Sequence, residues 1–526
     1  MVDKDLLSIQ EARALVRAAR KAQPEFARLS QERVDRVVCA VAEAAASQAE
    51  SLARMAVDET GFGKPEDKKI KNLLASEKVC ARIKDMKTVG VLHADAASKI
   101  VEIAVPVGVI AGIVPSTNPT STVIYKSLIA LKSGNAIVFT PHPSAKKCIA
   151  RTVEIIQGAL RACDVAPDLV SSISLPTIEG TNELMKIADL ILATGGPGMV
   201  KAAYSSGTPA LGVGAGNVPA YIERSADVKD AVAKIMSSKT FDNGTICASE
   251  QSIVTDACIA DQVRAALQEQ GGYFLTGEAL TKVKTVMERG NGSMNPAIVG
   301  RDAVTIAGVA GIEVPPGTRL LISDEKGIGP KYPFSKEKLT ALLSFYVVED
   351  WREACEVCTA LLHNGGVGHS LSIHSRDEDV IREFGLRKPV SRMLVNTPST
   401  QGAVGISTGL FPSFTLGCGA VGGSATSDNV TPLNLINVRR VAYDLHTPCD
   451  FRGQPACTAS SACGVSSVPG AAARPCPPSA ALSNCCGHAA NHDAVVAPQT
   501  PAPAPGGNLD INAITELIVA ELKKAL

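Results

Sequence analysis

The sequence predicts an α/β protein with two α/β domains, each built on a mostly parallel sheet. From about Val101, β-branched segments alternate with helical segments, which is the pattern of strand–helix–strand units. The pattern recurs, less clearly, between Ser249 and Val395. The first ~90 residues have the apolar period of helices, and the residues after Asp444 lose all such pattern.

Composition limits the class of protein. The 526 residues are 45% hydrophobic and 20% charged, which is ordinary for a soluble protein of several domains. Lys+Arg and Asp+Glu are both 52, and this balance argues against a broad nucleic-acid or membrane-surface patch. No apolar run reaches the roughly 18 residues of a membrane span, and the mixed-charge N-terminus lacks the core of an export signal. Fifteen scattered cysteines, an odd number, are typical of reduced intracellular thiols.

The elements follow in order along the chain. In the N-terminal helical region, Val34, Val37, Val38 and Val41 form one buried face, and Ser30 is its candidate N-cap. The first α/β domain has predicted strands at 101–114, 136–140, 169–175 and 188–194, with helices at 121–134 and 148–163. The second has strands at 252–255, 319–323 and 369–375, with helices at 259–270 and 351–364. Ligands of such sheets bind at the carboxyl ends of the strands.

The C-terminal region predicts a tether and a docking helix. Residues 446–507 are rich in Pro, Ala, Ser and Gly and cannot bury enough apolar surface to fold, so we expect a disordered linker. Residues 508–526 place apolar side chains on one helical stripe, which favours docking to a partner over folding back on the chain itself. The linker also holds soft metal ligands without paired C-x-x-C spacing, so we expect no metal site. These ligands are Cys449, Cys457, Cys463, Cys476, Cys485, Cys486, His488 and His492.

A cysteine in a loop of small polar residues is the leading candidate for chemistry. Cys247 lies in "FDNGTICASEQ", where it is either a small buried hydrophobe or a nucleophile. Asn118, between a predicted strand and a helix, is either a cap or a donor to an oxyanion. Thr194-Gly195-Gly196 follows a strand and precedes a helix, so it either binds a phosphate group at the helix start or simply forms a turn. His363 and His369 flank "NGGVG", where a histidine is catalytic or simply exposed.

Taken together, the motifs resemble the aldehyde dehydrogenase superfamily, and within it the CoA-acylating branch. The resemblance covers roughly 8–444. It rests on the segments "PSTNPTST", "FTPHPSAKK", "ATGGPGMVKAAYSSGTPALGVGAGNVP", "FDNGTICASEQS", "GGVGHS" and "GCGAVGGSATSDNVTPLNLINVRRVAY". The tether and terminal helix further resemble the cargo-targeting peptide of enzymes packed in bacterial microcompartments.

The resemblance implies an aldehyde dehydrogenase-like fold with two Rossmann-like α/β domains and a β-arm that joins subunits. It implies an NAD-binding domain at 1–235, a catalytic domain at 236–424 and an oligomerisation arm at 425–445, which pairs with a strand near 99–105. The implied oligomer is a homodimer or tetramer. By resemblance, Cys247 is the nucleophile, Asn118 the oxyanion donor, and His369 a group that helps deprotonate the incoming thiol. If a His369→Ala enzyme transferred the acyl group at an unchanged rate, His369 would have no role in deprotonating the thiol.

The resemblance also implies the cofactor site. The corresponding residues are Ser116, Thr140, Pro141, His142, Thr194, Gly195, Gly196, Met199, Gly214 and Glu337. Glu337 matches the acidic residue that holds the nicotinamide ribose. Hydrolytic members carry lysine, and often glutamate, after the strand at 136–140. This chain has Thr140-Pro141-His142-Pro143 there, as acylating relatives do. The contacts to the cofactor must therefore differ, and the sequence does not indicate whether NAD or NADP is preferred.

One departure from the hydrolytic members decides the expected chemistry. Hydrolytic members place a glutamate base in the segment that corresponds to "GVGAGN", and an alignment anchored on Pro219 puts Val213 at that position. Water needs a general base, typically worth ~10²–10⁴-fold, whereas a thiol with a pKa of about 8.5 needs less help. We therefore expect an aldehyde, NAD⁺ and CoA to give acyl-CoA and NADH through a Cys247 thioester.

Other functions remain as alternatives. A hydrolytic NAD-dependent aldehyde dehydrogenase would give the free acid, and a non-catalytic microcompartment cargo would need only the terminal helix. The length leaves no room for a second catalytic domain after Asp444, so we do not expect a bifunctional aldehyde–alcohol dehydrogenase. Propanal or ethanal is the implied substrate, and the lumen of a microcompartment the implied location. No residue of the predicted pocket chooses between the two aldehydes.

Overall fold

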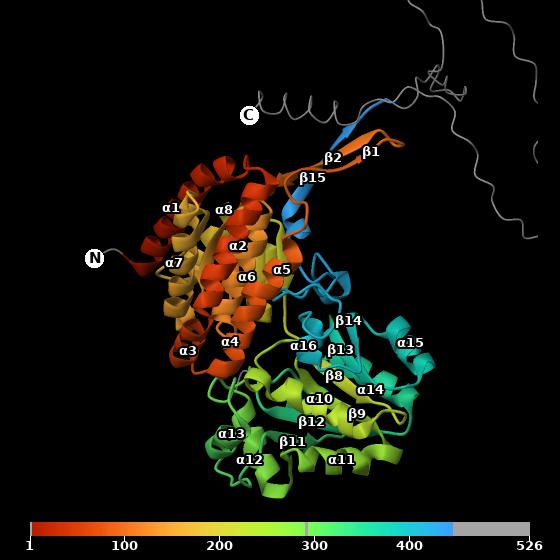
Figure 1. Cartoon of the computed structure of the whole chain (residues 1–526). Helices are drawn as coiled ribbons and strands as arrows, with labels where there is room; N and C mark the ends of the chain where they lie inside the picture. The colour runs from red at the N-terminus through yellow and green to blue at the C-terminus, as the bar shows by residue number, and fades with distance from the viewer. Residues whose placement is uncertain (1–2, 290–292, 445–526) are drawn as a thin grey trace, which may run out of the picture. The chain divides into compact units, whose positions relative to one another are not determined.

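The computed structural model describes residues 3–289 and 293–444 (Figure 1). Within this range the chain forms two compact units, a larger one of residues up to 92 together with 103–439, and a smaller one of 93–102 with the residues from 440 onward. In the described part of the chain, no helix has both the length and the apolar character needed to cross a membrane. The predicted linker at 446–507, the terminal helix at 508–526 and the cysteine-rich segment lie outside the described residues.

The N-terminal region is helical, as predicted. Its elements are α1 (Lys4–Phe26), α2 (Gln31–Ser47), α3 (Ala49–Thr60), α4 (Pro65–Leu73), a π-helical turn (Leu74–Lys78) and α5 (Val79–Ile83). The Ser30 side chain accepts a hydrogen bond from the Arg33 N–H, so the predicted cap is confirmed. The valine stripe of α2 is buried. Pro65 occupies the first turn of α4, where its missing N–H costs nothing.

The first sheet has five parallel strands in the order β5-β4-β3-β6-β7. Its strands are β3 (Val109–Val114), β4 (Ala136–Pro141), β5 (Val170–Ser172), β6 (Leu190–Thr194) and β7 (Ala210–Val213). The connecting helices are α6 (Pro119–Lys132), α7 (Lys146–Ala162), α8 (Ile178–Ile187) and α9 (Pro197–Ser205). Every residue of α6 is buried, including Lys126 and Lys132, whose ammonium groups donate to backbone carbonyls. The expected α/β architecture is therefore confirmed for this half.

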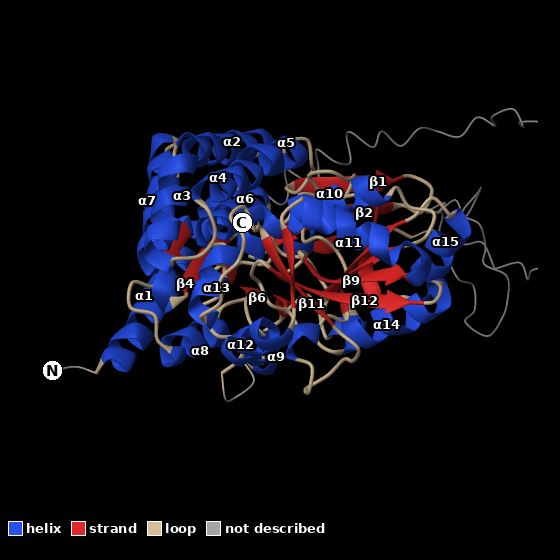
Figure 2. Cartoon of the chain, turned by 90° about the horizontal axis from the view of Figure 1, so that it is seen from below, coloured by secondary structure: helices blue, strands red, loops and turns tan. Residues whose placement is uncertain are grey.

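The second sheet has seven parallel strands in the order β10-β11-β12-β9-β8-β13-β14. Its strands are β8 (Val218–Ile222), β9 (Glu250–Asp256), β10 (Gly272–Leu275), β11 (Leu320–Asp324), β12 (Leu342–Val348), β13 (Gly368–His374) and β14 (Val390–Val395). The helices are α10 (Val228–Thr240), α11 (Ala260–Glu269), α12 (Gly277–Met287), α13 (Ala303–Ala310), α14 (Trp351–His363), α15 (Glu378–Arg387) and α16 (Ser399–Ala403). Figure 2 shows the strands enclosed between helices.

Alternate residues of the central strands explain the two covered faces of this sheet. Ile253 of β9 packs into one apolar cluster with α10 and α11, whereas Val254 packs into another with α14 and α15. Strands buried on both faces read as continuous apolar runs, as in β12, "LLSFYVV". Such runs are easily confused with buried helices, and β10, β12 and β14 were not predicted from the sequence.

The smaller unit contains part of each strand of a three-stranded β-arm. Strands β1 (Gly90–Asp95), β2 (Ile100–Pro106) and β15 (Ile436–Ala442) form a sheet in the order β1-β2-β15. Arg440 forms an ion pair with Glu102 at 3.0 Å, and the Tyr443 N–H donates to the Lys99 carbonyl at 3.1 Å. The two segments that the resemblance assigns to the arm thus pair with each other.

Candidate active site

A cavity of about 530 Å³ lies where four strands of the first sheet end. The segments after β3, β4, β6 and β7 all contribute to its wall, together with the loop that precedes β9. This is the edge at which open parallel sheets bind ligands. Apart from His369, the predicted site residues all line it. They are Ser116, Asn118, Thr140, Pro141, His142, Thr194, Gly195, Gly196, Met199, Gly214, Cys247 and Glu337.

The loop that carries Cys247 is held in an unusual backbone conformation. Asp242 and Asn243 have φ values of 49° and 52°, and Gly244 follows with 73°. Left-handed residues other than glycine cost free energy and persist only where the surroundings enforce them. Here the Asn243 side-chain N–H donates to the Gly300 carbonyl at 3.0 Å. The resulting tight turn brings the chain from α10 back toward the cavity before β9 begins.

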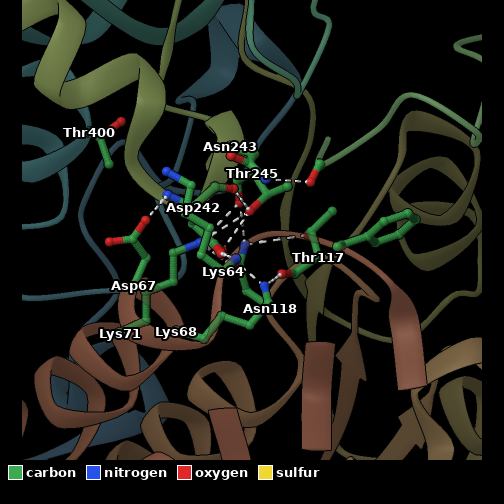
Figure 3. A network of polar contacts seen from close by, with 12 residues as sticks. Lys64, Asp67, Lys68, Lys71, Thr117, Asn118, Asp242, Asn243, Thr245 and Thr400 are labelled. Atoms are coloured by element: carbon green, nitrogen blue, oxygen red, sulfur yellow. Dashed lines mark hydrogen bonds and ion pairs between the residues drawn. The ribbon is translucent and has the colours of Figure 1, made fainter. Parts of the chain in front are cut away.

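A buried ionic network, whose cations come from α4, supports this turn (Figure 3). Asp242 is fully buried, and its carboxylate pairs with the ammonium groups of Lys68, at 2.9 Å, and Lys71. The Thr245 hydroxyl donates to the same carboxylate at 2.6 Å. Burial alone would raise the pKa of Asp242, but the two lysines hold that pKa below its usual value. Asp242 therefore stays ionised inside the protein.

Asn118 is the first residue before α6, yet its side chain does not cap the helix. The side-chain N–H₂ donates to the Thr245 carbonyl at 2.9 Å, and the side-chain oxygen accepts from the Lys71 ammonium at 2.6 Å. An amide N–H₂ has two donors, and the second makes only a long contact, 3.4 Å, with the Thr117 hydroxyl, so it can bind a further acceptor in the cavity. This geometry fits the oxyanion donor better than the helix cap.

The surroundings of Cys247 are largely apolar. Val213, Ile246 and Leu416 belong to the cluster against which Cys247 packs, and all three line the cavity. Burial raises the pKa of the Cys247 thiol to about 12, and the nearby Glu337 carboxylate adds to this. The cysteine is partly exposed, toward the cavity, and is a neutral thiol near pH 7 before a substrate binds.

Residue 213 lies in the wall of the cavity. Val213 ends β7 and lines the same cavity as Cys247. Among the described residues around the cavity, Glu337 is the one carboxylate. Its side-chain oxygen accepts from the Gly216 N–H at 3.0 Å, and burial raises its pKa to about 7.

Gly216 lies so close to its neighbours that no other residue fits there. A Cβ atom on this glycine would stand 2.0 Å from the Cys247 carbonyl oxygen and 3.1 Å from the His369 ring. Real Cβ atoms do not approach backbone atoms this closely. Gly216 therefore packs directly against the cysteine loop.

His369 does not line the cavity. The sequence places it in a glycine-rich loop, but the structure places it in β13, fully buried beside Gly216. Its Nδ1 lies 3.0 Å from the Ser370 hydroxyl. Burial, with a smaller effect of Arg392, lowers the pKa of His369 to about 3. The imidazole is thus neutral at pH 7 but a weak base, and its role toward the incoming thiol stays a prediction.

Sequence reasoning missed the lysines of α4. Lys68 and Lys71 read as solvated residues of the charged helix "PEDKKIKNL", yet both are 2% exposed. Their spacing of three residues puts them on one face of the helix. That face meets the cysteine loop only in the folded chain, so the sequence gives no local signal of their burial.

The comparison with known proteins agrees with the geometry. The profile of the aldehyde dehydrogenase family matches residues 5–287. The chain belongs to the aldehyde dehydrogenase family. Within it, the bifunctional aldehyde-alcohol dehydrogenase AdhE of Escherichia coli (strain K12) is 47% identical over 442 residues, which is 83% of this chain and 50% of that protein. The chain thus spans about half the length of this relative and of the aldehyde-alcohol dehydrogenase of Clostridium acetobutylicum.

Solved structures of aldehyde dehydrogenases are similar over nearly their whole length. An acetylating aldehyde dehydrogenase from Geobacillus thermoglucosidasius is 50% identical, with a TM-score of 0.84 over 85% of this chain and 99% of that one. A propionaldehyde dehydrogenase of the Clostridium phytofermentans fucose-utilisation microcompartment is 30% identical (TM-score 0.75; 82% and 97% covered). One from Rhodopseudomonas palustris, with bound CoA and an acylated cysteine, is 29% identical (TM-score 0.75; 82% and 97% covered).

Proposed function

We propose that this chain oxidises a short aliphatic aldehyde to its acyl-CoA, with NAD⁺ as hydride acceptor and CoA as acyl acceptor. One observation carries the proposal: apolar Val213, which the alignment on Pro219 matches to the glutamate of hydrolytic members, stands in the wall around Cys247. The similarity to an acetylating aldehyde dehydrogenase and to an enzyme with bound CoA supports it.

The chain's own residues supply most of the chemistry. The Cys247 sulfur adds to the aldehyde carbon as the thiol proton leaves, and the carbonyl oxygen becomes an oxyanion. The second N–H of Asn118 and the backbone N–H of Cys247 stabilise that charge. When bound, NAD⁺ accepts a hydride from the same carbon. The acyl group then remains on Cys247 as a thioester, until the thiol of CoA displaces the cysteine sulfur and regenerates the free enzyme.

The site around the thioester discriminates between water and a thiol. Water needs a base to become a useful nucleophile, and such a base typically contributes ~10²–10⁴-fold. Val213 offers none, and the carboxylate of Glu337 is engaged by the Gly216 N–H. A thiol is a few per cent ionised near neutral pH and needs less activation.

The cavity fits a dinucleotide. The N–H groups at the start of α9 have no side-chain cap, and Pro197 occupies the first turn. Gly196, just before the helix, has nothing within 4 Å of where a Cβ would be. Free N–H groups and open backbone at a helix start suit a pyrophosphate. Glu337 would hold the nicotinamide ribose, and Thr140 to His142 would lie near the adenosine half.

The product in the presence and absence of CoA tests the function. With CoA, NAD⁺ and propanal or ethanal, we expect NADH and acyl-CoA in equal amounts. Without CoA, we expect a burst of about one NADH per active site, followed by a rate at least roughly tenfold slower, because the unassisted thioester resists water. NADH formation at full rate without CoA would overturn the proposal and would point to Glu337 as a base for water.

We further propose that residues 508–526 direct the enzyme into a bacterial microcompartment and that the β-arm joins subunits. The similarity to a microcompartment propionaldehyde dehydrogenase and the amphipathic stripe of the last residues support the first proposal. A chain that lacks 508–526 should keep its kcat but lose co-purification with shells. Retained co-purification would remove the targeting role.

A further inference from the structure

We infer that Lys71 is a positioning residue for the oxidation step, because it fixes the side-chain amide of Asn118 in the one orientation that can stabilise an oxyanion. The inference rests on the proposed function, in which Asn118 donates to that oxyanion. Lys71 lies on α4, outside the wall of the cavity, and does not touch the reacting atoms.

The contacts of the amide determine its orientation. Lys71 carries only donors, and its ammonium lies 2.6 Å from the Asn118 side-chain oxygen. The Thr245 carbonyl can only accept, and it lies 2.9 Å from the side-chain nitrogen. Turning the amide over would set its N–H₂ against an ammonium and its oxygen against a carbonyl. Only one orientation therefore satisfies both neighbours, and it leaves for the substrate the second N–H, which contacts the Thr117 hydroxyl only at 3.4 Å.

Lys71 also joins the two loops that build the site. Its ammonium pairs with the Asp242 carboxylate in the cysteine loop, and it reaches Asn118 in the loop between β3 and α6. Figure 3 shows the side chain between these partners. An ammonium on the amide oxygen also polarises the amide, which makes its N–H a stronger donor. Lys71 thus sets both the direction and the strength of the donor.

Lys68 provides a matched control. It lies one turn earlier on the same face of α4, is as buried as Lys71, and pairs with the same Asp242 carboxylate at 2.9 Å. Its other partner is the Thr117 carbonyl at 2.8 Å, not the side chain of Asn118. Loss of either ammonium leaves Asp242 with one cation, but only loss of Lys71 releases the Asn118 oxygen.

A double-mutant cycle on the full chain tests the inference. We expect Lys71→Met to lower kcat roughly tenfold to a hundredfold, part of the 10²–10³ that loss of an oxyanion donor costs, with the aldehyde KM within about threefold. In an Asn118→Ala background, Lys71→Met should add less than about twofold, because the group through which it acts is gone. The fold-loss in kcat caused by Lys68→Met should instead multiply with the loss caused by Asn118→Ala.

Two outcomes would overturn the inference. One is a Lys71→Met effect that multiplies in full with that of Asn118→Ala, which a purely structural role would give. The other is a change in aldehyde KM with kcat unaltered. If Lys71→Met does not fold, as judged by circular dichroism, Lys71→Gln keeps a donor without the charge, and the same cycle applies. A wild-type enzyme that makes no acyl-CoA would refute the proposed function instead.

Discussion

A Cys247→Ala enzyme is expected to form no NADH from aldehyde, with a loss in kcat of roughly 10⁵-fold or more, as for other catalytic nucleophiles. The sulfur forms the adduct whose carbon gives up the hydride, and the C–S bond remains as the thioester. The cavity wall should survive, because Cys247 is small and partly exposed. Steady-state NADH formation, with the far-UV spectrum as a check on folding, measures the effect.

A second cysteine controls for the loss of a thiol. Cys258 is exposed, at the end of β9 and outside the cavity, so Cys258→Ala should keep the wild-type rate. Residual turnover above about 1% in Cys247→Ala would show that another group carries the acyl chain. Cys418, which is buried in the same apolar cluster, would then be the first to test.

The acidity of Cys247 gives this prediction a pH dependence. Burial raises the pKa of the thiol to about 12, so the thiolate is the minor form throughout the neutral range. Only the thiolate reacts with iodoacetamide, and its fraction rises tenfold per pH unit below the pKa. The alkylation rate of the free enzyme at Cys247 should therefore rise about tenfold per unit between pH 7 and 9. A plateau within that range would mean that the thiol is more acidic than its surroundings imply.

Asn118→Ala is expected to lower kcat by roughly 10²–10³-fold with a small change in aldehyde KM, because the lost N–H acts only when charge develops on the oxygen. The burst of NADH should slow by the same factor, since addition to the aldehyde precedes hydride transfer. Asn118→Asp should be at least as slow, because a carboxylate there repels the oxyanion. A kcat within threefold of wild type in Asn118→Ala would contradict the assigned role.

Much of the fold and most of the candidate site could be predicted from the sequence. The strand that ends at Thr194 and the cysteine in "FDNGTICASEQ" are local patterns, and both proved to lie at the cavity. The α/β class followed from the same alternation of segments. Local pattern and burial agree in such stretches, which is why sequence reasoning works there.

The remaining features depend on contacts between distant segments. His369 follows glycines and reads as a loop residue, yet β13 runs through it into the interior. Lys68 and Lys71 have the composition of a solvated helix, and only Asp242, more than 170 positions away, explains their burial. Strand β12 lacks alternation because both of its faces are covered. No window of sequence contains these partners.

The tight approach of Gly216 to the cysteine loop has a consequence for engineering this enzyme toward bulkier aldehydes. Gly216 has no space to give, since even a methyl group there would collide with the Cys247 carbonyl. Room must come from larger side chains of the cavity wall, and Phe414, Leu416 and Val404 are candidates for shortening. A randomised library should spare Gly216 and vary those three positions.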